Sequence, residues 1–272
     1  MKVHNKVFVV TGASGGIGSE LVLELLARGA KVAAVDLRPE GLHALKENAA
    51  EHADSITIHT LDITDKAAVS QLPGSVIKEH GTVDGLINCA GIIQPFVRVN
   101  DLAYETIDRV MNVNFYGTLY MTKSFLPHLL ERPEAHIVNV SSMGGFLPVP
   151  GQSVYGASKA AVKLFTEGLY AELLDTPVRV SVVFPGATNT DITKNSNVEV
   201  PKVTDANTKK LSAKMLSADK AAQIIVNGIE KDKPQIFTGS DSKLMNRLYR
   251  SNPVFAIKFI AKQMKSLLGS SK

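Results

Sequence analysis

Thr11-Gly12-Ala13-Ser14-Gly15-Gly16-Ile17-Gly18 joins an apolar run of strand length, Lys6 to Thr11, to a segment with helical spacing, Gly16 to Arg28. Its glycines fall where a tight turn, a close approach of the backbone to pyrophosphate, and close packing of helix on strand each need a residue without Cβ. The helix N-terminus then faces the phosphates. The stretch predicts a dinucleotide-binding turn that uses Gly12, Gly16 and Gly18. The alternative is an ordinary tight loop between a strand and a helix.

Strand-like and helix-like segments alternate on either side of this turn. Further apolar, β-branched runs cover Lys31 to Asp36, Ser55 to Thr60, Val83 to Asn88, His136 to Ser141, Val178 to Phe184 and Pro234 to Thr238. Helical spacing covers Pro39 to Glu51, Lys66 to His80, Leu102 to Leu130 and Ser153 to Leu174. Apolar strands that are each followed by a helix indicate a parallel sheet covered on both faces. We therefore expect an α/β fold, a Rossmann-type doubly wound parallel sheet of about seven strands in a single domain, with ligands outside the carboxyl ends of the strands.

Asp36 ends the second predicted strand, about twenty residues beyond the glycine turn. A carboxylate there accepts hydrogen bonds from the adenosine ribose, so the sequence favours NAD over NADP. Arg38 argues the other way, because a guanidinium at that place can contact a 2′-phosphate. Its alternative interpretation is a solvated surface charge.

Tyr155 and Lys159 stand four residues apart, which places them on one face of a helix. A lysine ammonium near a phenol favours the phenolate and lowers the tyrosine pKa from about 10, so that the tyrosine becomes a usable base near neutrality. Taken alone, such a pair is more often an ordinary surface contact. The rest of the chain decides between the two interpretations.

Taken together, six motifs in this order resemble the short-chain dehydrogenase/reductase family, specifically its shorter cytoplasmic-type members, along nearly all of residues 6 to 240. They are Thr11 to Gly18, Asn88-Cys89-Ala90-Gly91, Asn112-Val113-Asn114, Val140-Ser141-Ser142, Tyr155 to Lys159, and Pro185-Gly186 with Thr188 and Thr190. Cys89 replaces the second asparagine of the family's Asn-Asn-Ala-Gly element. We expect it to be a small buried core residue.

The resemblance implies a catalytic set of Asn114, Ser142, Tyr155 and Lys159. Tyr155 would be the general acid/base, Lys159 would tune it and bind the nicotinamide ribose, and Ser142 would hydrogen-bond the reacting oxygen. Asn114 would hold a water that links Lys159 to solvent; it is preferred to Asn112 because it directly precedes Phe115-Tyr116-Gly117. The implied cofactor-binding residues are Gly12, Ser14, Gly16, Ile17, Gly18, Asp36, Asp62 (on adenine), Ile63, Asn88, Ala90, Gly91, Tyr155, Lys159, Pro185, Gly186, Thr188 and Thr190. No metal is required, and a homodimer or homotetramer is expected.

The implied function is an NAD(H)-dependent oxidoreductase that interconverts a secondary alcohol and a ketone. Ile92 to Val97 and Met143 to Val149 are apolar, which suggests a hydrophobic substrate of the steroid, retinoid or fatty-acyl kind. These side chains can also simply pack the domain. The polar stretch Asp191 to Thr208 resembles the family's mobile substrate lid. Rival functions are epimerisation or dehydration, whose enzymes usually carry a larger C-terminal substrate domain, and a non-catalytic nucleotide sensor or scaffold, from which Tyr, Lys or Ser would be expected to be missing.

Composition and charge exclude other classes of protein. With 44% hydrophobic and 21% charged residues the chain is a globular protein, and its single cysteine excludes an intramolecular disulfide and a multi-cysteine metal site. The N-terminus lacks the layout of a signal peptide, so a cytoplasmic location is expected. Seven Lys or Arg and no acidic residue follow Asp241, so the preceding part has a net charge of −3 although the whole chain has +4. An acidic body of this kind argues against a nucleic-acid partner.

The basic segment sets a predicted boundary between a catalytic domain, residues 1–241, and a basic amphipathic C-terminal tail, residues 242–272. Asn252-Pro253 is a good helix start. One apolar face then contains Val254, Ile257, Ile260, Ala261, Met264, Leu267 and Leu268, with Lys258, Lys262 and Lys265 to one side and Phe255 and Phe259 beyond them. This surface suits peripheral contact with an anionic membrane, without a spanning helix. The alternative is a helix buried in a subunit contact or against its own domain.

Overall fold

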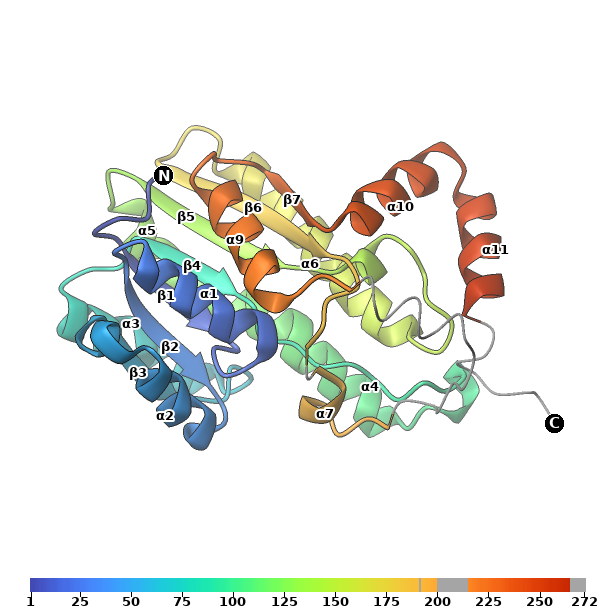
Figure 1. Ribbon diagram of the computed structural model, residues 1–272, viewed down its shortest axis with the longest axis horizontal. Coiled ribbons are helices and arrows are strands. Elements are labelled where there is room, and N and C mark those ends of the chain that lie inside the picture. The colour runs from blue at the N-terminus through green and yellow to red at the C-terminus, as the bar shows by residue number, and fades with distance from the viewer. Residues whose placement is uncertain (191, 200–214, 265–272) are drawn as a thin grey trace.

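The predicted strands form one seven-stranded sheet in the computed structural model, which describes residues 1–190, 192–199 and 215–264. All neighbouring strands are parallel, in the order β3-β2-β1-β4-β5-β6-β7 (Figure 1). The predicted fold class and strand number are therefore confirmed. The strand bounds are β1 Val7–Thr11, β2 Lys31–Asp36, β3 Ile56–Thr60, β4 Gly85–Asn88, β5 Ala135–Val140, β6 Val178–Pro185 and β7 Gln235–Thr238.

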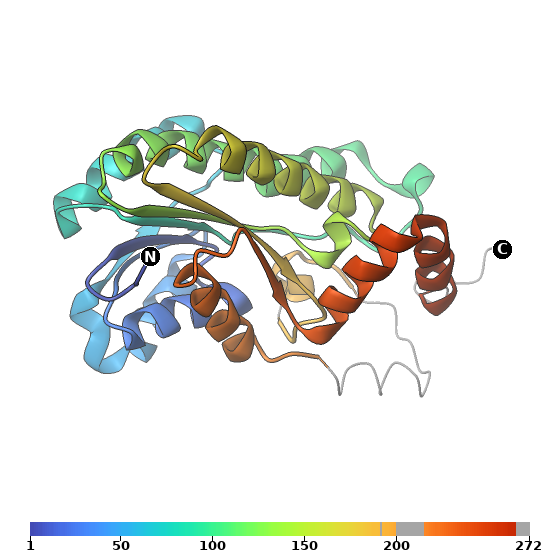
Figure 2. The same cartoon turned by 90° about the horizontal axis from the view of Figure 1, so that it is seen from above.

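Helices cover both faces of this sheet, because successive side chains of a strand point to opposite faces. Phe8 and Val10 pack with α1, α2 and α9 on one face, and Val7 and Val9 pack with α3, α5 and α6 on the other. Figure 2 shows these two helical layers above and below the sheet. The helix bounds are α1 Gly16–Ala27, α2 Pro39–Asn48, α3 Lys66–His80, α4 Tyr104–Met111, α5 Thr118–Leu130, α6 Ser153–Glu172, α7 Ile192–Asn195, α9 Ala218–Ile229, α10 Ser240–Ser251 and α11 Pro253–Gln263.

The winding reverses between β1 and β4, which are neighbours in the sheet but not in the chain. The Thr11 hydroxyl joins the two loops that leave these strands, because it accepts hydrogen bonds from the backbone N–H of Cys89 (3.1 Å) and Ala90 (3.2 Å). In a doubly wound sheet this reversal is where a ligand binds.

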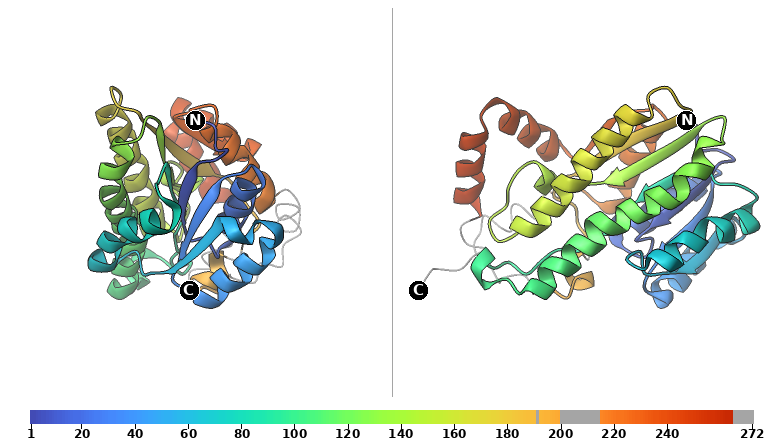
Figure 3. Two further views of the ribbon diagram at one scale, coloured as in Figure 1. Left: turned by 90° about the vertical axis from the view of Figure 1, so that its left-hand side faces the viewer. Right: turned by 180° about the vertical axis from the view of Figure 1, so that it is seen from behind.

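The predicted helix from Leu102 to Leu130 contains a π-helical stretch, η3 (Asn112–Gly117), between α4 and α5. Figure 3 shows these segments as one long rod along the back of the sheet. π-Helical turns are rare and are frequent at functional sites, and this one contains Asn114. The predicted helix from Pro39 to Glu51 ends at Asn48 and is followed by a short 3₁₀ segment, η1 (Ala50–Ser55). Two further 3₁₀ turns are η2 (Val99–Asp101) and η4 (Met143–Gly145).

Helix α10 crosses the predicted boundary after Asp241. Its first turn belongs to the body: the Asp241 carboxylate accepts the backbone N–H of Ala187 (2.8 Å), and the buried Ser242 hydroxyl donates to the Phe184 carbonyl (2.9 Å). Division into a body and a tail stays a prediction, and any dividing point has to lie beyond this turn.

Helix α11 begins as predicted, since the Asn252 side chain accepts the Phe255 N–H (3.0 Å) and Pro253 occupies the first turn. It packs on α10 and stands apart from the two helical layers (Figures 1 and 3). Within it only Ala256 is buried, so the predicted apolar face is not packed on the body at Val254 or Ile257. Lys265, Leu267 and Leu268 lie outside the described residues. Among the helices that the structure describes, none is both long and apolar enough to cross a bilayer.

Candidate active site

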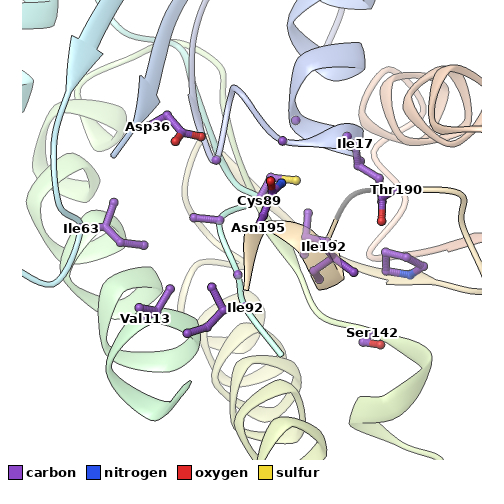
Figure 4. A pocket seen from close by; sticks show the side chains of 18 of the residues that line it. Ile17, Asp36, Ile63, Cys89, Ile92, Val113, Ser142, Thr190, Ile192 and Asn195 are labelled. Atoms are coloured by element: carbon purple, nitrogen blue, oxygen red, sulfur yellow. The ribbon is translucent and has the colours of Figure 1, made fainter. Parts of the chain in front are cut away.

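A cleft of about 350 Å³ opens at the carboxyl ends of the strands, where the winding reverses. Figure 4 shows Asp36 and Ser142 at opposite ends of it, with Ile63, Ile92 and Val113 along one side. Asp36, Ile63, Ile92 and Ser142 come from four different strand ends or loops and Val113 from η3, so the fold assembles the cleft from distant parts of the sequence. Its two ends differ in chemistry.

The glycine turn forms the floor between the two ends. Gly12 has a left-handed φ of 67°, and a Cβ on it would lie 2.7 Å from the Ala90 Cα. A Cβ on Gly18 would collide with the Gly12 carbonyl oxygen. The N-cap residue of α1 is Gly15, which has no side chain to accept the first N–H groups of the helix. The contacts at Gly12 and Gly18 require glycine at both positions for the turn to form, and the helix N-terminus that the turn exposes to the cleft fits a pyrophosphate.

Asp36 and Arg38 occupy the first end of the cleft together. The Asp36 carboxylate accepts the backbone N–H of Ser14 (3.0 Å) and of Arg38 (3.0 Å). The Arg38 guanidinium donates to Asp36 Oδ1 (3.4 Å), Ser14 Oγ (2.9 Å) and Asn195 Oδ1 (2.6 Å). Ser14, predicted to contact the cofactor, does not line the cleft and instead orients these two charged groups.

Tyr155, Lys159 and Ser142 all line the cleft, as the family resemblance implies. Lys159 Nζ donates to the Val140 carbonyl (3.0 Å), and burial lowers the pKa of this lysine to about 8. Burial raises the Tyr155 pKa, and a hydrogen bond with the Ser142 side chain opposes that rise. The expectation that Lys159 lowers the tyrosine pKa is wrong here. The loss of solvent around the phenol outweighs every favourable contact with its ionised form.

Asn114 and Asn88 lie behind the cleft wall rather than in it. Asn114 Nδ2 donates to the Ile92 carbonyl (2.9 Å) and to Ser158 Oγ (2.9 Å), while Oδ1 accepts the Ile92 N–H (2.8 Å). Asn88 Nδ2 donates to Thr122 Oγ1 (3.1 Å) and Asn139 Oδ1 (2.8 Å). Both side chains therefore hold neighbouring segments in place, and the water predicted at Asn114 stays a prediction.

The remaining predicted residues line the cleft: Gly12, Gly16, Ile17, Gly18, Asp62, Ile63, Ala90, Gly91, Pro185, Gly186, Thr188 and Thr190. Gly91 packs tightly beside the lysine, since a Cβ there would lie 3.0 Å from Lys159 Nζ. Cys89 also lines the cleft, and burial raises its pKa to about 11, so it is a neutral thiol at physiological pH. Sequence reasoning missed Val35, Leu37 and Leu61 as lining residues, and only proximity to Asp36 or Asp62 could have indicated them. Val113 and Val140 stood within the family motifs and Asn195 within the predicted lid, but none of the three was assigned a contact.

The described part of the predicted lid, residues 192–199, crosses the cleft. Asn195 bonds Arg38 as above, the Ser196 hydroxyl accepts the Ile93 N–H (3.0 Å), and the Ser196 carbonyl accepts from Arg109 Nη2 (2.9 Å). The segment therefore connects the Asp36 end to the loop after β4 and to α4. Residues 191 and 200–208 of the predicted lid lie outside the described residues.

Residues 6–200 match the family of short chain dehydrogenases. The chain belongs to this family. A protein named SadH from Mycobacterium tuberculosis is 36% identical over 251 residues, which is 91% of each chain, and 1-deoxy-11-beta-hydroxypentalenate dehydrogenase of Streptomyces avermitilis is 33% identical over 246 residues, 89% of this chain and 88% of the relative. A short chain dehydrogenase of Burkholderia cenocepacia solved with NADP has a TM-score of 0.79 at 27% identity and covers 96% of this chain and 99% of its own.

Family membership gives the reaction class. The chain is an NAD(P)-dependent oxidoreductase that acts on CH–OH groups. The glycine turn and the Asp36 carboxylate at the end of β2 line the same cleft and fit such a dinucleotide.

Proposed function

We propose that this short-chain dehydrogenase interconverts a secondary alcohol and a ketone, with Tyr155 as the general acid/base. The supporting observation is that Tyr155, Lys159 and Ser142 line one cleft, in which the Tyr155 and Ser142 side chains are hydrogen-bonded. When bound, the nicotinamide accepts or donates the hydride. In oxidation the Tyr155 phenolate takes the hydroxyl proton while the carbinol C–H bond gives up the hydride. In reduction the Tyr155 phenol returns that proton to the oxygen, which the Ser142 hydroxyl orients.

The raised Tyr155 pKa favours the neutral phenol, which is the form that donates a proton in ketone reduction. Oxidation requires the phenolate, so its rate should rise with pH in the alkaline range. Lys159 keeps its positive charge only below its pKa of about 8, so deprotonation of this lysine should oppose that rise. Pre-steady-state rates of NADH formation and consumption against pH test this assignment: an oxidation rate that falls as pH rises from 6 to 8 contradicts it.

We propose NAD(H) as the preferred cofactor, because the Asp36 carboxylate is almost fully buried at the cleft and would repel a 2′-phosphate bound beside it. The guanidinium of Arg38 is already bonded to Asp36, Ser14 and Asn195. Titration of the protein with NADH and NADPH should show at least about tenfold tighter binding of NADH. Asp36→Asn should reduce the difference in affinity between NADH and NADPH, and Arg38→Ala should weaken the binding of NADPH alone. Tighter binding of NADPH by the unaltered protein would overturn the preference.

We propose a hydrophobic substrate of the steroid, retinoid or fatty-acyl kind. The cleft wall near the catalytic end includes the apolar side chains of Ile92, Val113, Val140 and Ile192. A panel of secondary alcohols and ketones of increasing apolar size, followed by NADH absorbance, tests this proposal. Activity confined to small polar alcohols would contradict it, and activity with none would favour the rival proposal of a nucleotide sensor or scaffold.

A homodimer or homotetramer is proposed from the exposed apolar side chains Leu164, Tyr170 and Leu174 on and just beyond α6, which are unusual on a solvated helix. Light scattering of the purified chain tests the assembly. A cytoplasmic location is proposed from the single cysteine of the chain.

Helix α11 supports a second proposed partner, an anionic membrane surface. The side chains of Val254, Phe255, Ile257 and Phe259 are all exposed. The Phe255 and Phe259 rings stack with their centroids 6.3 Å apart, and Lys258 and Lys262 lie on the same helix. Exposed apolar side chains beside cations suit insertion between anionic headgroups. Co-sedimentation with phosphatidylserine vesicles at low salt should be lost in the variant with both Phe255→Ser and Phe259→Ser. Equal binding by the variant, or no binding by the full chain, would exclude this surface.

A further inference from the structure

Helix α6 begins two residues before its tyrosine, so the way in which its N-terminus is held affects the position of Tyr155. The first N–H groups of any helix lack an acceptor within the helix. A side chain at the N-cap position usually supplies one, yet Gln152 at that position makes no side-chain bond to the helix N-terminus.

Gln94 provides the missing acceptor from the loop after β4. Its Oε1 accepts the backbone N–H of Val154 (2.8 Å) and of Tyr155 (3.0 Å), and its Nε2 donates to the Gly151 carbonyl (3.0 Å). In return, Gln152 Nε2 donates to the Gln94 carbonyl (2.7 Å). Both glutamine side chains are buried. Four hydrogen bonds therefore join a single loop residue to the start of α6.

This arrangement connects two walls of the cleft. The loop that contains Gln94 also contains Gly91 and Ile92, which line the cleft, and Ile92 is bonded in turn to Asn114. A cap supplied from a separate loop fixes the helix start relative to that loop, whereas a local cap would fix it only relative to its own turn. Because one of the two captured N–H groups is that of Tyr155 itself, the anchor acts at the residue whose phenol contacts Ser142.

We propose that Gln94 is a positioning residue that holds Tyr155 in register with Ser142 and with the cleft wall. The inference rests on the proposed role of Tyr155 as acid/base. Gln94 does not contact substrate in this role, since its Oε1 accepts two N–H groups, its side chain is buried, and it is not among the residues that line the cleft.

The test compares Gln94→Met with Gln94→Glu in the full chain. Methionine keeps the volume but removes every side-chain hydrogen bond, whereas a carboxylate still accepts both N–H groups at a helix N-terminus that favours negative charge. We expect Gln94→Met to lower kcat by about tenfold or more, because small displacements of a catalytic group are costly. Its affinity for NADH should stay within about twofold, and Gln94→Glu should recover most of kcat. The pH of half-maximal oxidation should move to higher values in Gln94→Met, because the Ser142 hydrogen bond that lowers the Tyr155 pKa is weakened.

Asp65→Ala is the matched control. The Asp65 carboxylate caps α3 by accepting the N–H groups of Ala67 (2.9 Å) and Ala68 (3.2 Å), and no residue of that helix lines the cleft. This variant should lower Tm while leaving kcat and its pH profile unchanged. If Gln94→Met does not fold, Gln152→Met, which removes a single bond of the same set, should lower kcat in the same direction but less.

Wild-type kcat and pH profile in Gln94→Met, or in Gln152→Met where that variant has to replace it, would overturn the inference. Equal losses of kcat and of NADH affinity would also overturn it, because they indicate general damage to the cleft. Wild-type turnover by Tyr155→Phe would instead overturn the proposed function, so the two failures are distinguishable.

Discussion

The two ends of β5 carry similar chemistry and differ in access to the cleft. Beyond its carboxyl end, the Ser142 hydroxyl contacts the Tyr155 phenol, and Lys159 donates to the Val140 carbonyl. At its amino end, His136 Nε2 lies 2.7 Å from the Ser181 hydroxyl and His136 Nδ1 lies 3.7 Å from Asp232 Oδ1. Each end therefore places a serine hydroxyl beside a buried titratable ring, with a charged group nearby.

Burial shifts the pKa of both rings toward the neutral form, upward for Tyr155 and down to about 3 for His136. At the amino end, however, the Ser181 hydroxyl donates to the Lys233 carbonyl, and neither His136 nor Ser181 lines the cleft. A strongly shifted pKa is thus a weak indicator of function without access to a ligand site. The comparison predicts that substitutions at the carboxyl end change turnover, and that substitutions at the amino end change stability.

Tyr155→Phe should give the largest effect. It removes the transferable proton but keeps the ring, so turnover should fall by at least about a hundredfold while NADH binding and Tm stay close to those of the wild type. Steady-state kinetics with a cofactor titration measure this effect. Near-normal turnover would remove the functional distinction between the two ends of β5.

The paired substitutions Ser142→Ala and Ser181→Ala should come next. Ser142→Ala removes a hydroxyl from the reacting end and should lower kcat between about tenfold and a hundredfold, the cost of one hydrogen bond to a charged group. Because that hydroxyl lowers the Tyr155 pKa, oxidation should also require higher pH. Ser181→Ala should leave kcat unchanged and lower the free energy of unfolding by about 1 kcal/mol. A loss of kcat in Ser181→Ala with unchanged kcat in Ser142→Ala would contradict the assignment of turnover to the carboxyl end of β5.

The sequence predicted those parts of the site that depend on local pattern. The glycine turn, the strand ends and the Tyr155 to Lys159 spacing are set within one segment each, and the structure brings them to a single cleft. The direction of the Tyr155 pKa was wrong because burial is a property of the packed chain, whereas the spacing shows only that a lysine is near.

Contacts between distant segments could not be predicted, because they leave no pattern within one stretch of sequence. Asn195 reaches Arg38 from 157 residues away, and Gln94 caps a helix whose start lies some sixty residues later. A glutamine in an apolar loop has no signature of a cap, since caps are recognised from residues adjacent to the helix. For α11 the sequence left two alternatives open, a membrane-facing helix and a helix packed on protein, because apolar spacing alone is compatible with both. The exposure of Val254 and Ile257 could be read only from the structure.

Alanine substitutions at the two ends of β4 should give smaller effects on kcat and on stability. A Cβ on Gly91, beyond the carboxyl end of β4, would lie 3.0 Å from Lys159 Nζ and 3.3 Å from Asn114 Oδ1. We expect Gly91→Ala to lower kcat about tenfold by displacing the lysine. A Cβ on Gly85, at the amino end, would collide with the Phe8 ring, so Gly85→Ala should cost about 1–3 kcal/mol of stability. The kcat of Gly85→Ala per folded molecule should not change. A loss of kcat in Gly85→Ala but not in Gly91→Ala would contradict the assignment of turnover to the carboxyl ends of the strands.

His136→Asn tests the amino end with the smallest effect, seen only in how stability depends on pH. Burial holds the folded-state pKa of His136 near 3, below the value of about 6.5 for an unfolded histidine. Asp232 opposes this shift, whereas the Met1 amino group and Arg179 add to it. Between these two pKa values the unfolded chain binds the extra proton, so the contribution to stability is complete above pH 6.5 and is lost as pH falls.

Chemical denaturation should therefore show that the free energy of unfolding falls between pH 7.5 and pH 6 by about 0.8 kcal/mol more in the wild type than in His136→Asn. This value depends only on the folded-state pKa being well below 6, and ordinary carboxylates do not titrate in the window. Burial also lowers the pKa of His59 and His80, but both are present in the two proteins, so their contributions cancel in the difference. Equal losses of stability in the two proteins would mean that His136 takes up a proton in the folded state. The amino end of β5 would then be accessible to solvent, as the carboxyl end is.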